Sequence, residues 1–212
     1  MASNKKTFIQ ILWTCGALLV GFPAAAQDTA RGEVLYTYCT QCHGEDGAGD
    51  VSTGVPNIGG LSAWYVEGQV NKFRDGRRGA HPDDRLGLRM RPMSRSLDSD
   101  EDVAAVAAYV ASMPVNKPPA TIEGDATKGA GTYALCGTCH GANGEGNQAM
   151  NGPSLNIAAD WYLYTQLANF KSGVRGAAAQ DAEGAVMAGM SNVLADDQAI
   201  KDVIAHIQTL AQ

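Results

Sequence analysis

The feature that most constrains the fold is the pentapeptide Cys-Gly-Thr-Cys-His at residues 136–140, which recurs as Cys-Thr-Gln-Cys-His at residues 39–43, 97 positions earlier. On a helix, the two thiols of such a motif lie one turn apart, where they can add across the two vinyl groups of a haem. The histidine that follows is then placed to bind the iron. A redox-active dithiol or half of a zinc site would use the same Cys-x-x-Cys spacing. A zinc site needs further ligands, and the remaining histidines, His81 and His206, do not recur at the repeat spacing. The sequence therefore predicts two covalently bound haem groups.

The same spacing relates many other residues, with no insertion or deletion between the copies. The coinciding pairs are Gly32/Gly129, Tyr36/Tyr133, Pro56/Pro153, Trp64/Trp161, Tyr65/Tyr162, Gln69/Gln166, Phe73/Phe170, Arg78/Arg175, Gly79/Gly176, Met90/Met187, Met93/Met190, Ser94/Ser191 and Leu97/Leu194. The chain is therefore a tandem duplication. Each copy spans about 85 residues, which suits a small domain that completes its core with a bound haem.

Three helices are expected in each copy, and no segment shows the alternation typical of a strand. Apolar spacing predicts helices over about 28–39, 62–74 and 103–112, and over 127–136, 159–171 and 199–210 in the second copy. Cap residues precede the last helix of each copy, at 98–100 and 196–197. The glycine-rich stretches 44–49 and 141–146 lack the strand and lysine of a phosphate-binding loop, so they are expected to turn around a haem edge. The predicted fold class is all-α.

The first residues have the pattern of an export signal. Lys5 and Lys6 precede an apolar stretch over 8–22 and a small-residue segment, which predicts a signal peptide over 1–26. An uncleaved anchor would be the alternative, although the apolar run is shorter than a membrane-spanning helix usually needs. The expected domains are 27–114 and 125–212, joined by a proline-rich linker over 115–124. The mature chain would have no transmembrane helix, and its location would be periplasmic.

The charge of the chain limits its partners. Without the first 26 residues, 14 basic and 22 acidic residues remain. A net negative charge argues against nucleic acid and anionic lipid and favours a basic patch on a protein partner. Peripheral association with a membrane remains compatible with such a chain.

The second axial ligand decides whether a haem carries electrons or binds a small molecule. Methionine is the ligand expected in a carrier, because its soft thioether favours ferrous iron. The first copy offers Met90 or Met93, and the second offers Met187 or Met190.

With these motifs, the chain resembles the class I bacterial cytochromes c, and in particular the dihaem cytochromes c of the c-four group. The resemblance covers nearly all of the mature chain. It implies two class I domains, each wrapped around one covalent haem c. It favours the methionine seven residues before Leu97 or Leu194 as the ligand, and leaves Met93 and Met190 as the alternatives. It implies thioether bonds at Cys39, Cys42, Cys136 and Cys139, proximal ligands His43 and His140, distal ligands Met90 and Met187, and carbonyls of Pro56 and Pro153 that hold the proximal imidazoles.

Three differences between the copies matter. In the resemblance, the first helix crosses the last one beside an aromatic residue, which is Tyr109 in the first copy but His206 in the second, where we expect a packing role. His81 has no counterpart and is expected in an exposed loop. The first copy also has arginines around its methionines: Arg74, Arg77, Arg78, Arg85, Arg89, Arg91 and Arg95. They are either a solvated face or a group that stabilises the reduced first haem and marks a docking face.

The expected function is electron transfer, one electron at each haem, without a catalytic site. The donor would be a quinol-oxidising cytochrome bc complex or a dehydrogenase, and the acceptor a terminal oxidase or reductase. The alternatives are the cytochrome subunit of a periplasmic dehydrogenase and a dihaem peroxidase. A peroxidase needs an iron open to peroxide, and a methionine candidate in both copies argues against it.

Overall fold

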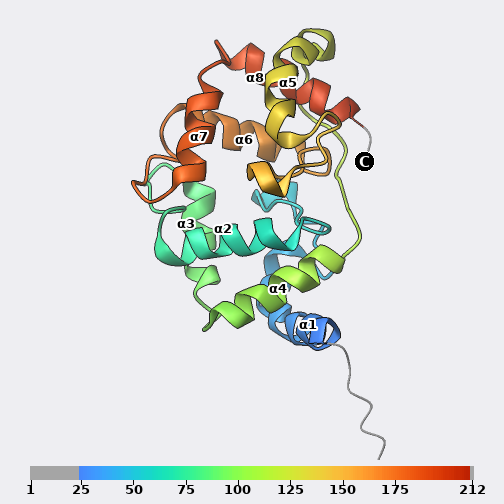
Figure 1. The fold of residues 1–212 in the computed structure, drawn as a ribbon, viewed down its shortest axis with the longest axis vertical. Coiled ribbons are helices and arrows are strands. Elements are labelled where there is room, and N and C mark those ends of the chain that lie inside the picture. The colour runs from blue at the N-terminus through green and yellow to red at the C-terminus, as the bar shows by residue number, and fades with distance from the viewer. Residues whose placement is uncertain (1–23, 211–212) are drawn as a thin grey trace, which may run out of the picture.

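The computed structural model describes residues 24–210, and the regular secondary structure in this range is helical (Figure 1). The expected signal peptide therefore lies mostly outside the described residues. The first copy contains α1 (Ala24–His43), the 3-10 turn η1 (Val51–Thr53), α2 (Ala63–Asp75), α3 (Arg85–Ser94) and α4 (Asp100–Ser112). The second contains α5 (Ala126–His140), η2 (Gln148–Met150), α6 (Asp160–Lys171), α7 (Ala182–Ser191) and α8 (Asp197–Thr209). No strand forms between residues 24 and 210, where two isolated β-bridges, Asp50 with Val55 and Asn147 with Gly152, enclose η1 and η2. The all-α prediction is confirmed.

In each copy the first helix packs against the last, α1 on α4 and α5 on α8. The crossing is close because a glycine stands at the contact: a Cβ on Gly32 would overlap the carbonyl of Ala105. The rings of Tyr36 and Tyr109 pack with centroids 5.4 Å apart, and those of Tyr133 and His206 are 5.2 Å apart. His206 therefore takes the place of Tyr109 at the crossing, as expected of a packing residue.

Two separate hydrophobic cores follow from this pairing. The first consists mainly of residues from α1, α2 and α4, the second of residues from α5, α6 and α8. Val103 and Ile204 are fully buried in them. The predicted caps also form: Ser99 accepts a hydrogen bond from the backbone amide of Asp102 (3.1 Å), and Asp196 from that of Ala199 (2.9 Å). These caps fix where α4 and α8 begin.

The sequence prediction missed one helix in each copy. Helices α3 and α7 contain the candidate methionines, and each begins at an aspartate that caps it, Asp84 or Asp181. Glycines and, in α3, a proline weaken the helical pattern of these segments. The first helix of each copy is also longer than expected, because it continues through the Cys-x-x-Cys-His motif.

The two domains, α1–α4 and α5–α8, follow one another along the longest axis of the molecule, and the linker runs beside them without helical structure (Figure 1). The linker is held at both ends. Asn116 donates a hydrogen bond to the backbone carbonyl of Asp46 (3.2 Å), and Asp160 accepts from the backbone amides of Thr121 and Ile122. The domains also contact each other directly, which the sequence did not predict. Asn57 donates to the carbonyl of Ile157 (2.8 Å) and accepts from the amide of Ala159 (3.0 Å).

Candidate haem sites

The Cys-x-x-Cys-His motifs form the last turns of α1 and α5. Because the two cysteines of each motif are three positions apart on a helix, they lie on neighbouring positions of one face. No disulfide joins the four cysteines; Cys42 is exposed, and Cys39, Cys136 and Cys139 are half-buried. Burial raises the pKa of the Cys39 thiol to about 11, and it also raises that of Cys136. A redox dithiol needs a readily formed thiolate, so this alternative interpretation is disfavoured.

The histidine of each motif is buried, and its Nδ1 atom lies within hydrogen-bond distance of a proline carbonyl. The Nδ1 atom of His43 lies 3.0 Å from the carbonyl oxygen of Pro56, and that of His140 lies 2.8 Å from the carbonyl oxygen of Pro153. Burial lowers the pKa of both histidines, against the opposing effect of the proline carbonyls. Each imidazole is thus kept neutral and oriented, with its Nε2 atom available to a metal.

The glycine-rich loops fold back over these histidines. The amide of Gly49 donates to the carbonyl of His43 (2.9 Å), and the amide of Gly146 donates to that of His140 (2.8 Å). Both glycines have positive φ, at 71° and 87°. A Cβ on Gly49 would clash with the carbonyls of Val55 and Pro56. The loops are therefore tight turns that bring the proline carbonyls to the histidines.

The candidate methionines differ in exposure. Met93 is 45 % exposed, whereas Met90 on the same helix is half-buried. In the second domain, Met187 and Met190 are both half-buried. Burial therefore separates the two candidates in α3 but not those in α7. His81 is exposed, and its nearest charged partner is Asp83 at 3.8 Å.

Two buried arginines meet between the domains. The sequence prediction grouped Arg78 with the arginines around the first methionines and assigned Arg175 no role. Each arginine bonds both glutamines: Arg78 donates to Gln69 and Gln166 (3.0 Å each), and Arg175 donates to Gln166 (2.7 Å) and Gln69 (2.8 Å). Arg78 also donates to the hydroxyl of Tyr162 (2.6 Å). We call these five residues the arginine–glutamine cluster. All five belong to coinciding pairs of the repeat, Tyr162 with Tyr65, and this is the signal that could have revealed the cluster.

The arginine–glutamine cluster contains no carboxylate of its own. Against the effect of burial, Tyr162, Tyr65 and the nearby buried Asp84 raise the pKa of Arg78. Neither arginine forms an ion pair within residues 24–210, and the Nε atom of Arg78 is buried without a hydrogen-bond partner. Burial, followed by the charge of Arg78, lowers the pKa of Arg175. Two buried cations need anions nearby, and a haem brings two carboxylates of its own. The cluster therefore fits a group with acidic side chains between the domains.

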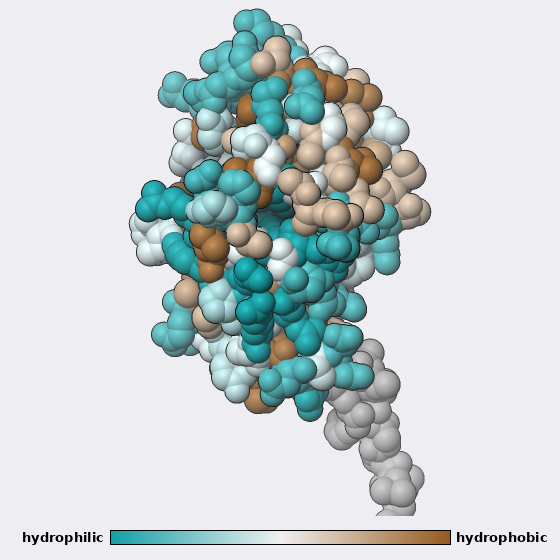
Figure 2. Space-filling model, turned by 90° about the vertical axis from the view of Figure 1, so that its left-hand side faces the viewer, coloured by the Kyte–Doolittle hydropathy of each residue, from teal (hydrophilic) through white to brown (hydrophobic). Residues whose placement is uncertain are grey.

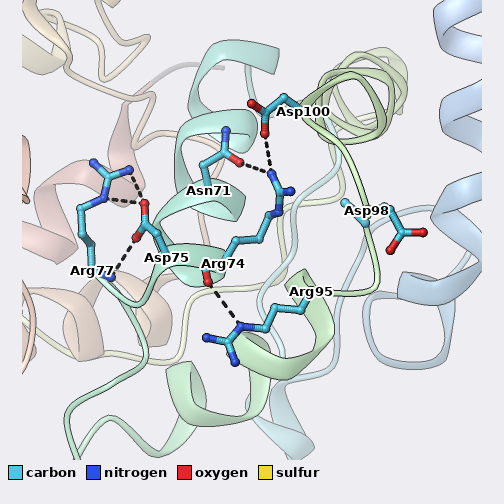
Figure 3. Close-up of a pocket in the computed structure, with 8 residues that line it drawn as sticks. Asn71, Arg74, Asp75, Arg77, Arg95, Asp98 and Asp100 are labelled. Atoms are coloured by element: carbon cyan, nitrogen blue, oxygen red, sulfur yellow. Dashed lines mark hydrogen bonds and ion pairs between the residues drawn. The ribbon is translucent and has the colours of Figure 1, made fainter.

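The other arginines of the first domain lie towards the surface, around α2 and α3. Figure 3 shows three of them in an open depression of about 650 Å³: Arg77 beside Asp75, Arg74 between Asn71 and Asp100, and Arg95 on the backbone of Arg74. Arg85 and Arg89 lie one turn apart on α3, are exposed and form no ion pair in the described part of the chain. We call these two residues the arginine face. Arg95 is also exposed, but it shares the depression with Asp75, Asp98 and Asp100. The carboxylates thus neutralise part of the positive charge and form no ion pair with the arginine face.

The second domain has no such face. Ala182 and Val186 of α7 occupy the positions of Arg85 and Arg89, and Val186 is 63 % exposed. Hydrophilic residues accordingly cover most of the lower half of the molecule in Figure 2, where the first domain lies, and apolar residues gather on the right of the upper half.

Residues 24–210 contain neither a further candidate metal site nor a candidate membrane-spanning helix. No group of three or more His, Cys, Asp or Glu side chains is arranged to hold a metal ion in this range. None of the helices in it is long and apolar enough to cross a membrane.

Comparison with known proteins gives one consistent result. A family model described as cytochrome c matches residues 29–114 and again 126–211. The chain is 29 % identical to cytochrome c4 of Azotobacter vinelandii over 97 % of its own length and 99 % of that protein. It is 32 % identical to a thiosulfate dehydrogenase electron acceptor of Stutzerimonas stutzeri, over 90 % of this chain and 91 % of the other. Among solved structures, reduced cytochrome c4 from Pseudomonas stutzeri matches with a TM-score of 0.67 and 25 % identity, over 86 % of this chain and 98 % of that one.

Proposed function

The chain belongs to the cytochrome c family, and from that premise we propose that it is a periplasmic carrier whose two haem irons are each bound by one histidine and one methionine. It is a dihaem protein of the cytochrome c4 type, and its function is electron transfer. Haem c is attached covalently at Cys39 and Cys42 and at Cys136 and Cys139. The bound irons supply one-electron oxidation and reduction.

The observation that carries the proposed ligation is the repeated histidine geometry. His43 and His140 are buried, are held at Nδ1 by a proline carbonyl, and have pKa values lowered by burial. A neutral imidazole with a fixed orientation is what iron ligation requires. We assign Met90 and Met187 as the opposite ligands, with Met93 and Met190 as the alternatives. The exposure of Met93 supports Met90 in the first domain.

The arginine–glutamine cluster supports a further assignment. We assign Arg78 and Arg175 to the haem carboxylates, because these two cations are buried and have no carboxylate partner of their own among the described residues. Since each arginine bonds a glutamine of both domains, the same residues that would bind the haem groups also hold the domains together. The relative position of the two haems would then follow from side chains in the interface.

Export and domain limits belong to the same proposal. A signal peptide over 1–26 would direct the chain to the periplasm, and the domains would span 27–114 and 125–212 around the linker 115–124. No catalytic residues are assigned, because electron transfer requires no bond-making site in the protein.

The carrier exchanges electrons with other redox proteins. We propose that an acidic patch of one of them docks on the arginine face, because Arg85 and Arg89 are exposed and form no ion pair among the described residues. A cytochrome bc complex or a dehydrogenase would be the donor, and a terminal oxidase or reductase the acceptor. Similarity to a thiosulfate dehydrogenase electron acceptor favours a second candidate function, that of electron-accepting subunit or partner of a periplasmic dehydrogenase.

Optical spectra of the purified mature protein, with a haem count and exposure of the reduced form to carbon monoxide, test the proposed ligation. We expect two low-spin haems per chain, the spectral bands of His/Met ligation and no reaction with carbon monoxide. A haem that binds carbon monoxide would contradict it, because one iron would then have an open position and the peroxidase or ligand-binding alternative would return. Copurification with a dehydrogenase would favour the second candidate function.

A further inference from the structure

One ion pair between the domains has no counterpart in the other copy. Lys72, near the end of α2, is buried, and its Nζ atom lies 2.5 Å from Oδ1 of Asp181 and 3.0 Å from Oε2 of Glu183. Lys72 belongs to the first domain, and both carboxylates belong to the second. We call these three residues the lysine bridge.

Both carboxylates of the lysine bridge lie at the start of α7, the helix that carries the methionines of the second domain. The Oδ1 atom of Asp181 also accepts a hydrogen bond from the amide of Gly184 (3.2 Å), so the same oxygen caps α7 and binds Lys72. Asp181 is almost fully buried. Without a cation, its charge would be costly in that position. Lys72 thus supplies the ion-pair partner of the carboxylate that caps α7.

The reciprocal bridge is missing because its residues have changed. Asn169 of α6 stands at the position that corresponds to Lys72, and Leu86 stands at that of Glu183. Asp84 still caps α3, through the amide of Gly87 (3.0 Å), and is still buried. No ion pair joins Asp84 to the second domain within residues 24–210. The cap of α3 therefore has no cation of the second domain as an ion-pair partner.

From this difference we propose that Lys72 is a positioning residue that acts across the interface, so that methionine ligation in the second domain depends on contact with the first domain. The dependence runs in one direction only. Helix α7 begins at a buried aspartate that forms an ion pair with Lys72 of the other domain and also interacts electrostatically with Arg77. The equivalent Asp84 at the start of α3 interacts with Arg78 of its own domain and forms no ion pair with the second domain within residues 24–210. Loss of Lys72 would loosen the start of α7, and with it the placement of the methionine. This inference rests on the proposed methionine ligation but holds for either Met187 or Met190, since both lie on α7.

The test is proton NMR of the reduced dihaem protein during titration with guanidinium chloride. The methyl group of an iron-bound methionine lies against the haem ring, whose current shifts its proton signal far upfield, so each haem gives its own signal. Substitutions at Met90 and Met187 assign the two signals. In Lys72→Asn, which copies the residue of the other domain, we expect the signal of the second domain to disappear at lower denaturant concentration than in the native protein. The signal of the first domain should disappear at its native concentration.

A matched control is Lys201→Asn, which removes the same charge from an ion pair inside α8, with Asp197 at 2.5 Å. We expect it to leave both midpoints unchanged, and Lys72→Arg, which keeps the charge, to retain most of the native midpoint. The proposal is overturned if Lys72→Asn shifts both signals together, since the bridge would then be a general contribution to stability. It is equally overturned if neither signal moves.

If Lys72→Asn does not fold, Glu183→Gln weakens the same bridge without leaving Asp181 unpaired. We expect a smaller shift, again confined to the second signal, and an unchanged second signal would overturn the inference. Failure of the proposed ligation is seen separately: neither Met187→Ala nor Met190→Ala would then remove an upfield signal from the protein.

Discussion

Helices α3 and α7 occupy the same place in the two domains, yet they share little of their surface. Both begin at a buried capping aspartate and carry two methionines three residues apart. Where α3 exposes arginines, α7 exposes alanine and valine. Positions that face the interior have been kept and positions that face solvent have changed. The comparison indicates that duplication preserved the binding of two haems while the outer faces became suited to different contacts.

The interface between the domains contains both kept and differing positions. Arg78 and Arg175 with Gln69 and Gln166 form a nearly symmetric set, because each arginine needs the glutamines of both copies. A change in any one of them would leave a buried polar group unpaired. Lys72 lies outside this set: it is buried, yet asparagine stands at its position in the second copy.

The methionines provide the strongest test of the equivalence of the two domains. We expect Met90→Ala and Met187→Ala each to abolish the iron–methionine absorption band of one haem. Each should also lower the potential of that haem by a sizeable part of the ~0.8 V range that axial ligands cover. The measurement is a spectroelectrochemical titration of each variant. Met93→Ala and Met190→Ala are the controls, and the domains would differ in ligation if Met190→Ala, but not Met187→Ala, removed the band.

Exchange of the surface residues of α3 and α7 sharpens the contrast in charge. Arg85→Ala with Arg89→Val gives α3 the residues of α7. We expect oxidation by hexacyanoferrate(III), an anionic probe, to slow by about tenfold at low ionic strength and to depend less on salt, because local positive charge speeds the approach of anions. The potential of the first haem should also fall, since nearby cations favour reduced iron.

Stopped-flow kinetics over a range of salt concentrations measures the rate, and a cationic cobalt complex serves as the control, with the opposite expected change. An unchanged salt dependence together with an unchanged potential would show that the arginine face acts on neither the approach of anions nor the iron.

His206 offers the smallest test, because it already packs where Tyr109 packs. We expect His206→Tyr to change the stability of the second domain by less than about 1 kcal/mol, in the stabilising direction, since a tyrosine pair is worth about 0.5–1.5 kcal/mol beyond its buried area. Guanidinium denaturation followed by fluorescence measures the effect. Tyr109→His should shift the first domain in the opposite direction, and a large loss in either variant would mean that the two crossings are not equivalent.

The local parts of the site could be predicted from the sequence. Cysteines, histidines and prolines recur at one spacing, and their chemistry is carried by short motifs that need no knowledge of distant contacts. Helices α3 and α7 escaped prediction because their glycines and, in α3, Pro92 weaken the helical pattern. Each helix is stabilised at its start by a buried capping aspartate, Asp84 or Asp181. A cap of this kind is recognised only when its burial is known.

The sequence by itself determined the number of domains, the places where haem is attached and the all-α fold. The repeat is visible by comparing the chain with itself, and the motif spacing and the apolar periodicity can each be read within a few helical turns. Only the tertiary structure decided how the domains meet. The arginine–glutamine cluster and the lysine bridge join residues about a hundred positions apart. Their contribution depends on burial, which removes water from the charges and makes each partner necessary. That burial arises only when the two domains pack together.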